Sequence, residues 1–403
     1  MKEDNMKQGW EVKKIKDIAT LITDGDWIES RHQSEEGIRL IQTGNIGEGY
    51  FKAKDDKPHY ITHQTFKVLG CTEIFPGDCI VSRLPDPVGR ACIIPEIYCR
   101  MITAVDCTII RFEQKVIPQF FIYYSLSDSY ENEINKNTTG TTRKRISRKK
   151  LEQIPIPVPP LPVQEQIVSE LDLLSGIIEK KREQLKELDV LAQSIFYDMF
   201  GDPITNEKGW EVKKLKNITS KIGSGATPKG GNESYKTEGI SLIRSLNVHN
   251  NSFVYKDLAY IDDNQAETLK NVTIEENDVL LNITGASVAR CCVVPSNVLP
   301  ARVNQHVAII RAREILNNTF LCYLLTSHSY QQELISIGKC NGATREAITK
   351  GQLENLDIPI PPLPLQRQFA SKIEAIERQK ELIKQSITET ETLFNERMQH
   401  YFG

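Results

Sequence analysis

The sequence predicts an α+β fold in which two similar β-rich globular domains are separated by an antiparallel coiled coil of two long helices. Three observations predict this fold. The motif at residues 9–16 returns at 209–216, the motif at 161–166 returns at 363–368, and a long heptad pattern follows each copy of the second motif. Because the same parts follow one another twice, the chain is expected to carry an internal pseudo-twofold repeat.

Each globular domain is predicted from short apolar runs separated by Gly, Pro, Asn and Asp. In residues 1–154 the expected strands lie at 37–41, 78–82, 90–94 and 107–111, with a short helix at 118–126. In residues 201–356 the same order gives strands at 240–244, 278–281, 290–294 and 307–311. The two halves differ mainly between these shared runs, as expected for one fold that carries different loops.

A proline-rich strap closes each globular domain, at residues 155–160 and 359–362. Repeated prolines fix φ and favour an extended, semi-rigid connector. A long helix follows each strap at once, so residues 155–200 and 357–403 are each predicted to be a strap plus a helix.

Apolar residues in both helices alternate spacings of four and three, which is typical of a coiled-coil seam. The predicted seam comprises Ile167, Leu171, Leu174, Leu185 and Leu188 in the first helix and Phe369, Ile373, Ile376, Ile383 and Ile387 in the second. Lys181 and Lys380 interrupt it, and they either set the register or mark a docking site for a partner helix. Connectivity favours antiparallel pairing within one chain, and pairing between chains is the alternative.

The composition is that of an ordinary soluble protein, with 39% hydrophobic residues, 26% charged residues and a formal net charge of −3. No apolar run approaches the length of a membrane span, and the first residues carry no apolar secretory signal. We therefore expect a cytoplasmic protein without a membrane partner. The 9 cysteines form no CxxC pair and the 7 histidines show no ligand spacing, so no metal site is predicted.

No catalytic signature is found in the chain. Residues 223–230 are glycine-rich but lack the Gly-Lys-Ser/Thr ending of a phosphate-binding loop. HExxH, GxSxG, GxGxxG and kinase-type motifs are absent, as is an Asp/Asn-Pro-Pro-aromatic motif for adenine methylation. The sequence therefore predicts a protein that is not an enzyme, and an enzyme with an unrecognised site is the weaker alternative.

A set of repeated motifs carries a family resemblance. The set comprises Gly-Trp-Glu-Val-Lys-Lys at 9–14 and 209–214, Gly-Ser-Gly-Ala-Thr-Pro at 223–228, Gly-Thr-Thr-Arg at 140–143 with Gly-Ala-Thr-Arg at 342–345, and the Ile-Pro-Ile-Pro segments at 154–157 and 358–361. In this order they resemble the specificity subunits of type I restriction–modification systems, over essentially the whole chain. The first domain departs from the pattern at 22–27, where it lacks Gly-x-Thr-Pro, so the loop correspondence there is open.

The resemblance implies two target-recognition domains, at 1–154 and 201–356, that each recognise one half of a bipartite DNA sequence. It implies that the helices of 155–200 and 357–403 set the gap between the half-sites and dock methyltransferase subunits, two of them in the expected complex. Double-stranded DNA, methyltransferase subunits and restriction–motor subunits are the implied partners. This chain is expected to hold no cofactor, because S-adenosylmethionine, ATP and Mg²⁺ would be bound by the partner subunits that methylate and cleave.

Polar residues at strand ends and turns are candidates for DNA contact, because Arg, Lys, Asn and Gln distinguish base edges and basic or hydroxyl groups bind phosphates. In the first domain the candidates are Thr43, Asn45, Arg83, Arg90, Arg143, Lys144 and Arg145. In the second they are Lys229, Arg244, Asn247, Asn282, Arg290, Asn304, Gln305, Thr344 and Arg345. For each candidate the alternative is a solvated or turn-stabilising side chain. The basic run at 143–150 is either a phosphate clamp or the exposed face of a short helix.

Two other functions are compatible with the repeat. A coiled-coil adaptor would bind proteins through its globular domains and would show no sequence-dependent affinity for DNA. A specificity subunit of another bipartite restriction system would share the architecture, and the neighbouring genes would distinguish it from the type I hypothesis.

Overall fold

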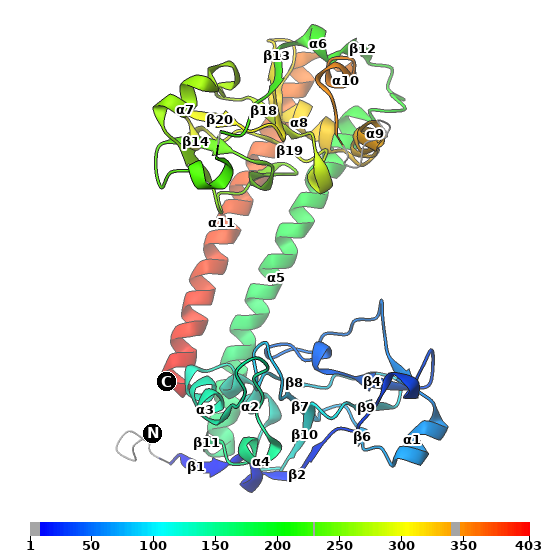
Figure 1. Ribbon diagram of the computed structural model, residues 1–403, viewed down its shortest axis with the longest axis vertical. Helices are drawn as coiled ribbons and strands as arrows, with labels where there is room; N and C mark the ends of the chain where they lie inside the picture. Colours follow the sequence, from blue (N-terminus) through cyan, green and yellow to red (C-terminus); the bar gives the residue numbers. More distant parts are fainter. Residues whose placement is uncertain (1–8, 229, 340–346) are drawn as a thin grey trace. The chain divides into compact units, whose positions relative to one another are not determined.

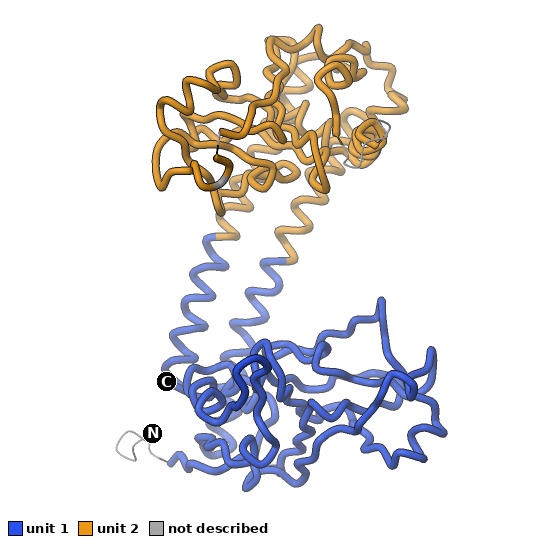
Figure 2. Tube along the Cα trace, in the orientation of Figure 1, with its two compact units in different colours: residues 1–182, 385–403 blue, residues 183–384 orange. Residues whose placement is uncertain are grey.

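The computed structural model describes residues 9–228, 230–339 and 347–403, and the chain forms two compact units (Figures 1 and 2). Unit 1 comprises Met1–Arg182 with Gln385–Gly403, and unit 2 comprises Glu183–Lys384. Each unit contains a β-rich globular part and a segment of both long helices, α5 (Leu161–Phe200) and α11 (Leu363–Phe402). The predicted α+β fold with two similar domains and two long helices is confirmed.

The globular part of unit 1 contains two main sheets. Its antiparallel four-stranded sheet has the order β2 (Ala19–Asp24), β10 (Cys107–Phe112), β7 (Cys79–Ser82) and β8 (Ala91–Ile93). Its five-stranded sheet has the order β3 (Gln33–Ser34), β5 (Tyr60–Ile61), β4 (Ile38–Ile41), β9 (Met101–Thr103) and β6 (Glu73–Ile74). The four strands expected in this domain therefore correspond to β4, β7, β8 and β10.

Unit 2 repeats the four-stranded sheet with the same connectivity. The order is β13 (Thr219–Ser224), β21 (Val307–Ala312), β18 (Val279–Asn282) and β19 (Cys291–Val293). A three-stranded sheet has the order β17 (Ala259–Ile261), β14 (Ile240–Ile243) and β20 (Ala301–Val303), and β15 (Val248–His249) pairs with β16 (Ser252–Phe253). The expected strands of this domain are thus β14, β18, β19 and β21.

An apolar helix joins the core of each unit, α2 (Pro118–Ser125) in unit 1 and α8 (Asn318–Thr326) in unit 2. In unit 1 this core includes Phe120 and Phe402, and in unit 2 it includes Phe320. The basic run, for which the sequence offers a short helix as one alternative, ends in α4 (Arg148–Leu151). Other helices that the sequence does not predict are α1 (His63–Leu69), α3 (Asp128–Asn137), α6 (Leu215–Ile218), α7 (Asp263–Thr268), α9 (His328–Lys339) and α10 (Lys350–Glu354).

Each copy of the first duplicated motif forms a two-stranded ribbon with the strap of its own domain. In unit 1, β1 (Glu11–Lys14) pairs antiparallel with β11 (Pro155–Val158), and in unit 2, β12 (Glu211–Lys214) pairs with β22 (Asp357–Ile360). The straps are therefore extended as expected, but they are paired strands and not connectors. Tyrosine hydroxyls donate to the first carbonyl of each strap strand, from Tyr124 to Pro155 at 2.8 Å and from Tyr330 to Asp357 at 3.0 Å.

A buried glutamine from the second motif ties each long helix to its domain. The Gln164 amide oxygen accepts from the Ile117 N–H at 2.9 Å, and its amide nitrogen donates to the Pro159 carbonyl at 2.8 Å. Gln366 repeats this arrangement, accepting from the Asn317 N–H at 2.8 Å. Because each side chain satisfies backbone groups from two segments, it fixes the start of the helix against the loop before α2 or α8.

The long helices pair antiparallel within unit 1. Arg397 of α11 forms an ion pair with Glu170 of α5, and the Lys181 ammonium donates to Ser386 Oγ at 2.6 Å. The partner in α11 therefore moves toward lower numbers as α5 advances, which defines an antiparallel pair within one chain.

The helix segments of unit 2 show the same direction of pairing. Phe196 packs on Phe369 with ring centroids 5.7 Å apart, and the Lys380 ammonium lies 2.6 Å from Asp189. Burial opposes the charge on Lys380, but hydrogen bonds to Asp189 and Glu377 raise its pKa above the ordinary value. Both seam lysines thus have polar partners inside a helix pair.

Most predicted seam residues lie in the interior. Buried members are Ile167, Leu171, Leu174, Phe369, Ile373 and Ile376, and half-buried members are Leu185, Leu188, Ile383 and Ile387. Near the C-terminal ends the buried positions become Phe196 and Phe200 in α5, and Met398 and Phe402 in α11. Because these residues are spaced four apart, the last apolar side chains of each helix point into a domain core.

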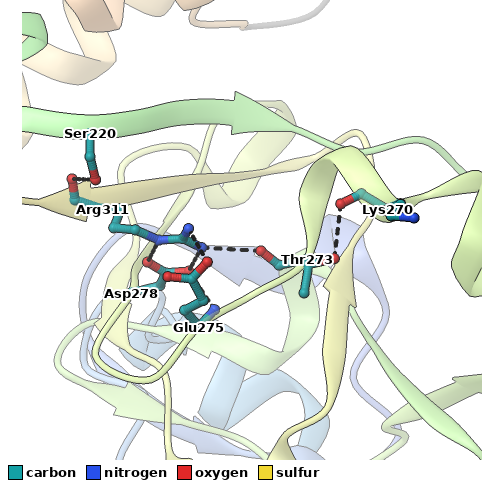
Figure 3. Close-up of polar contacts among 6 residues, drawn as sticks. All are labelled: Ser220, Lys270, Thr273, Glu275, Asp278 and Arg311. Carbon is teal, nitrogen blue, oxygen red and sulfur yellow. Dashed lines mark hydrogen bonds and ion pairs between the residues drawn. The ribbon is translucent and has the colours of Figure 1, made fainter.

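A buried ion pair is repeated in both four-stranded sheets. Arg311 donates two hydrogen bonds to Asp278, each 2.8 Å long, and the aspartate is fully buried (Figure 3). Arg111 and Asp78 form the same bidentate pair at 2.7 and 2.9 Å. The hydrogen bonds to Asp278 raise the pKa of Arg311, so the guanidinium stays charged. The pair joins β21 to the turn before β18.

Arg311→Ala should destabilise unit 2, because it leaves the Asp278 carboxylate buried without its cation. Removing one partner of a buried pair costs about 3–5 kcal/mol of unfolding free energy. Hydrogen exchange of peptides from β18 and β21 would measure this loss. Arg378→Ala is the control, since its 3.7 Å pair with Glu374 is exposed and should contribute less than about 1 kcal/mol. Equal losses in the two variants would contradict the prediction.

Candidate nucleic-acid interface

A group of loops in unit 1 is held together by backbone hydrogen bonds. The Ile146 N–H donates to the Arg83 carbonyl at 3.3 Å, and the Arg83 N–H donates to the Asp106 carbonyl at 2.9 Å. The Ala104 N–H donates to the Ile41 carbonyl at 3.1 Å. These bonds connect loops that are far apart in the sequence.

Unit 2 holds the corresponding loops by the same bonds. The Ile348 N–H donates to the Ile283 carbonyl at 2.8 Å, and the Ile283 N–H donates to the His306 carbonyl at 3.0 Å. The Asn304 N–H donates to the Ile243 carbonyl at 3.1 Å. We call these loops the loop edge of each unit, defined by residues 25–28, 83–90, 104–106 and 139–145 in unit 1 and by 225–228, 283–290, 304–306 and 347 in unit 2.

A glycine allows the first loop of each edge to approach the neighbouring backbone. A Cβ at Gly25 would overlap the Thr103 carbonyl oxygen, and one at Gly225 would overlap that of Val303. Only glycine fits such close approaches without a shift of the backbone. The two glycines therefore align the loops whose correspondence the sequence leaves open, and they place Trp27 where unit 2 has Thr227.

Side chains on the two loop edges differ although the backbone bonds agree. The matched positions carry Trp27 and Thr227, Val105 and Gln305, Asp106 and His306, Arg83 and Ile283, and Arg145 and Ala347. A shared backbone frame with different polar groups is suited to binding two different sequences of the same kind of ligand.

Arg90 is held inside unit 1. Its guanidinium donates to the carbonyls of Ile46, Leu84 and Pro87 at 2.8 Å and to that of Thr43 at 2.9 Å. Burial lowers the pKa of Arg90, and all of these acceptors are backbone oxygens. The geometry therefore gives Arg90 a structural role, and Thr43 contributes its carbonyl to that role.

Asn45 and Asn247 stabilise equivalent turns. The Asn45 side-chain oxygen accepts from the Gln42 N–H at 2.9 Å, and that of Asn247 accepts from the Arg244 N–H at 3.1 Å. Both asparagines are buried, and both also donate to backbone carbonyls. Their amides hold the turns, which is the structural alternative that the sequence leaves open.

Two further arginines differ in accessibility. Arg83 is buried, with its guanidinium bonded to the Val105 carbonyl and 3.4 Å from Asp24. Arg244 is half-buried, donates to the Asp257 carbonyl and lies over the Tyr235 ring at 5.3 Å. Arg83 is thus directed into the domain, whereas Arg244 retains a partly exposed position.

The basic run forms the tip of a small hairpin. Thr139 and Arg145 exchange backbone hydrogen bonds of 2.9 and 2.8 Å, and Arg145 lies 3.3 Å from Asp106. Arg143 and Lys144 are exposed between them, and neither forms an ion pair or side-chain hydrogen bond in the part of the chain that the structure describes. The following residues form α4, so the run divides into a loop tip and a short helix.

A chain of polar side chains crosses the loop edge of unit 2. Thr227 donates to Gln305, the Gln305 amide nitrogen lies 3.0 Å from His306 Nε2, and His306 Nδ1 lies 2.5 Å from Thr284 Oγ1. Asn304 is buried beneath them and accepts from the His306 N–H at 3.0 Å. The edge thus presents an exposed amide beside hydroxyl and imidazole groups that bond donors and acceptors alike.

Arg290 and Asn282 differ in how far they are exposed. Arg290 is half-buried and lines a cleft of about 570 Å³ together with Thr284, Ser287 and His306. Asn282 is fully buried and donates to the Ser245 carbonyl at 2.8 Å. The remaining candidates, Lys229, Thr344 and Arg345, lie outside the described residues.

Trp27 belongs to the loop edge although the sequence does not predict it as a site residue. It is 69% exposed, while the residue before it is fixed by a hydrogen bond from the Thr72 N–H to the Asp26 carboxylate at 2.8 Å. Ile28, the residue after it, packs against a buried cluster. The alignment of Gly25 with Gly225 is the signal that could have placed Trp27 on the loop edge.

The described residues offer neither a metal site nor a membrane-spanning helix. Among residues 9–228, 230–339 and 347–403, no group of three or more His, Cys, Asp and Glu side chains is arranged to hold a metal ion. No helix in these ranges is both long and apolar enough to cross a bilayer.

The fold and the loop edges define a class of protein with two matched recognition domains and one pair of long helices, segments of which belong to each unit. Residues 7–188 and 207–392 both match the family described as the type I restriction modification DNA specificity domain, and the chain belongs to this family. It is similar to the putative type I restriction enzyme MjaX specificity subunit of Methanocaldococcus jannaschii, with 24% identity over 93% of this chain and 90% of that protein.

Solved structures resemble this fold along its whole length. A chain from a study of complex assembly and conformational transition in the type I R-M system aligns with a TM-score of 0.62 at 19% identity, over 99% of this chain and 98% of the other. The type I restriction-modification system S subunit from M. genitalium aligns with a TM-score of 0.57 at 13% identity, over 99% and 96%. At these identities the likeness concerns the fold.

Replacing Arg143 and Lys144 together by Ala should weaken DNA binding equally for all sequences, because unpaired exposed cations bind phosphates and not base edges. The slope of log affinity against log salt should fall by about 0.9 for each phosphate that is no longer bound. Salt titrations of DNA binding by the full chain would measure this. Arg148→Ala is the matched control, since Arg148 already pairs with Glu152 at 3.3 Å. A changed recognition sequence would contradict the clamp hypothesis.

Proposed function

We propose that this chain is the DNA sequence-specificity subunit of a type I restriction–modification complex and has no catalytic activity of its own. In this proposal residues 1–154 and 201–356 are target-recognition domains, and each recognises one half of a bipartite DNA sequence. The observation that carries the proposal is the pair of loop edges, which share backbone hydrogen bonds and differ in their polar side chains. Family membership supports the same assignment.

The proposal assigns the chemistry to partner subunits. Two methyltransferase subunits would bind S-adenosylmethionine and dock on the helices of 155–200 and 357–403, and restriction–motor subunits would bind ATP and Mg²⁺. Exposed apolar side chains outside the helix seam support docking on these helices, because such residues are typical of the centre of protein interfaces. They include Leu173 and Leu393 in unit 1, and Val190 and Leu382 in unit 2.

The proposal is tested by co-expressing the chain with the methyltransferase encoded beside it and mapping methylated adenines across the host genome. We expect one split motif with a fixed gap between its halves. The methyltransferase expressed without this chain is the control and should leave no such motif. If the complex forms and no motif is methylated, the adaptor hypothesis becomes the better explanation.

The helices should determine the gap between the half-sites. Inserting one heptad after Arg182 and another after Lys384 lengthens both helices and leaves the pairs Lys181–Ser386 and Lys380–Asp189 intact within their own units. A heptad adds about 10.5 Å of helix, which corresponds to roughly three base pairs. Methylome mapping should therefore show a longer spacer between unchanged half-sites. An unchanged spacer would refute the assignment of this role to the helices.

A further inference from the structure

Arg90 and Arg290 occupy the same backbone position in the two units. The Ser82 N–H donates to the Arg90 carbonyl at 2.9 Å, and the Asn282 N–H donates to the Arg290 carbonyl at 2.8 Å. The two arginines nevertheless differ in what their guanidinium groups bind.

In unit 1 the Arg90 guanidinium binds the carbonyls of Thr43 and Ile46, at 2.9 and 2.8 Å. Ser82 lies nearby, and its short side chain donates instead to the Leu84 carbonyl at 3.2 Å. Arg90 is therefore the side chain that binds both carbonyls in unit 1.

In unit 2 an asparagine side chain donates to the two equivalent carbonyls. The carbonyls that correspond to those of Thr43 and Ile46 belong to Ser245 and Val248, and the Asn282 amide donates to them at 2.8 and 3.3 Å. Asn282 stands at the position of Ser82 and is 0% exposed. Because Asn282 already binds these carbonyls, the Arg290 guanidinium does not bind them and is not held in the interior.

The Arg290 side chain lines a cleft on the loop edge. Arg290 forms no side-chain hydrogen bond or ion pair with any residue that the structure describes. It lines the cleft of about 570 Å³ beside Thr284, Ser287 and His306, and among the described residues of this lining no other carries a fixed charge. A single arginine among hydroxyl and imidazole groups is better suited to a base edge than to a run of phosphates, which several cations usually bind together.

We propose that Arg290 recognises a guanine in the half-site bound by unit 2, and that Asn282 is the residue that positions it. The planar guanidinium would donate two parallel hydrogen bonds to guanine O6 and N7, the commonest specific contact in the major groove. Arg90 makes no such contact in unit 1, because its donors are bound to backbone carbonyls. This inference rests on the proposed function of the chain.

Methylome mapping of Arg290→Ala tests the contact. Preference for one guanine in the second half-site should fall by roughly 5- to 150-fold, while the first half-site and the spacer stay unchanged. Arg290→Lys should lose the same preference, because it keeps a charge and a long aliphatic stem but lacks the bidentate fork. This second variant guards against a folding defect, which would reduce methylation at every site.

The outcomes separate the two proposals. If the unaltered complex methylates no split motif, the proposed function fails. If it does, and Arg290→Ala methylates the same motif with the same preference, only the assignment of Arg290 fails. Equal weakening for all sequences, with a salt slope lower by about 0.9, would identify Arg290 as a phosphate-binding residue and overturn the guanine assignment.

Asn282→Ser tests the positioning role. With serine at this position Arg290 should turn inward onto the carbonyls of Ser245 and Val248, as Arg90 does in unit 1. Guanine preference should then fall as it does in Arg290→Ala, and the double variant should show no additional loss. Full preference in Asn282→Ser, or additive losses in the double variant, would contradict the role. A merely structural asparagine would change stability and leave the preference as it was.

Discussion

The attachment of each recognition domain to its helix depends on one buried glutamine, Gln164 in the first half and Gln366 in the second. Each side chain accepts from a backbone N–H and donates to a carbonyl on the loop before α2 or α8, and it donates to a second carbonyl just after the strap strand. An unsatisfied buried group costs about 1–3 kcal/mol, so an arrangement that breaks these bonds is disfavoured by about that much for each group left without a partner. The loop edges can therefore vary in sequence without changing how the domain is attached to the helix.

Much of the fold can be predicted because its signals are local. Heptad spacing identifies both long helices, and short apolar runs identify strands such as β10 and β21. The straps are predicted as connectors because the pairing of β1 with β11 joins segments at opposite ends of a domain. Short helices such as α6 and α10 are not predicted, since they span only 4 and 5 residues and carry little periodicity.

The candidate site is harder to predict, because residue type alone does not show which way a side chain points. Arginine stands at both equivalent positions, 90 and 290, but Arg90 binds the two carbonyls in unit 1, whereas Asn282 binds the equivalent carbonyls in unit 2. Asn45 and Asn247 have the chemistry of base-contacting residues but hold turns. Trp27 is not predicted, because its place on the loop edge follows from Gly25. The close approach of Gly25 to the Thr103 carbonyl of β9 is visible only in the structure.

The prolines in the two-stranded ribbon of β1 and β11 also affect whether the chain associates with other molecules. A two-stranded ribbon has open edges, and such edges recruit strands from other molecules and begin aggregation. Prolines in β11 supply no N–H to an incoming strand, and the Pro155 carbonyl is already occupied by the Tyr124 hydroxyl. The prolines of β11 therefore also disfavour pairing of other chains with this edge of the ribbon.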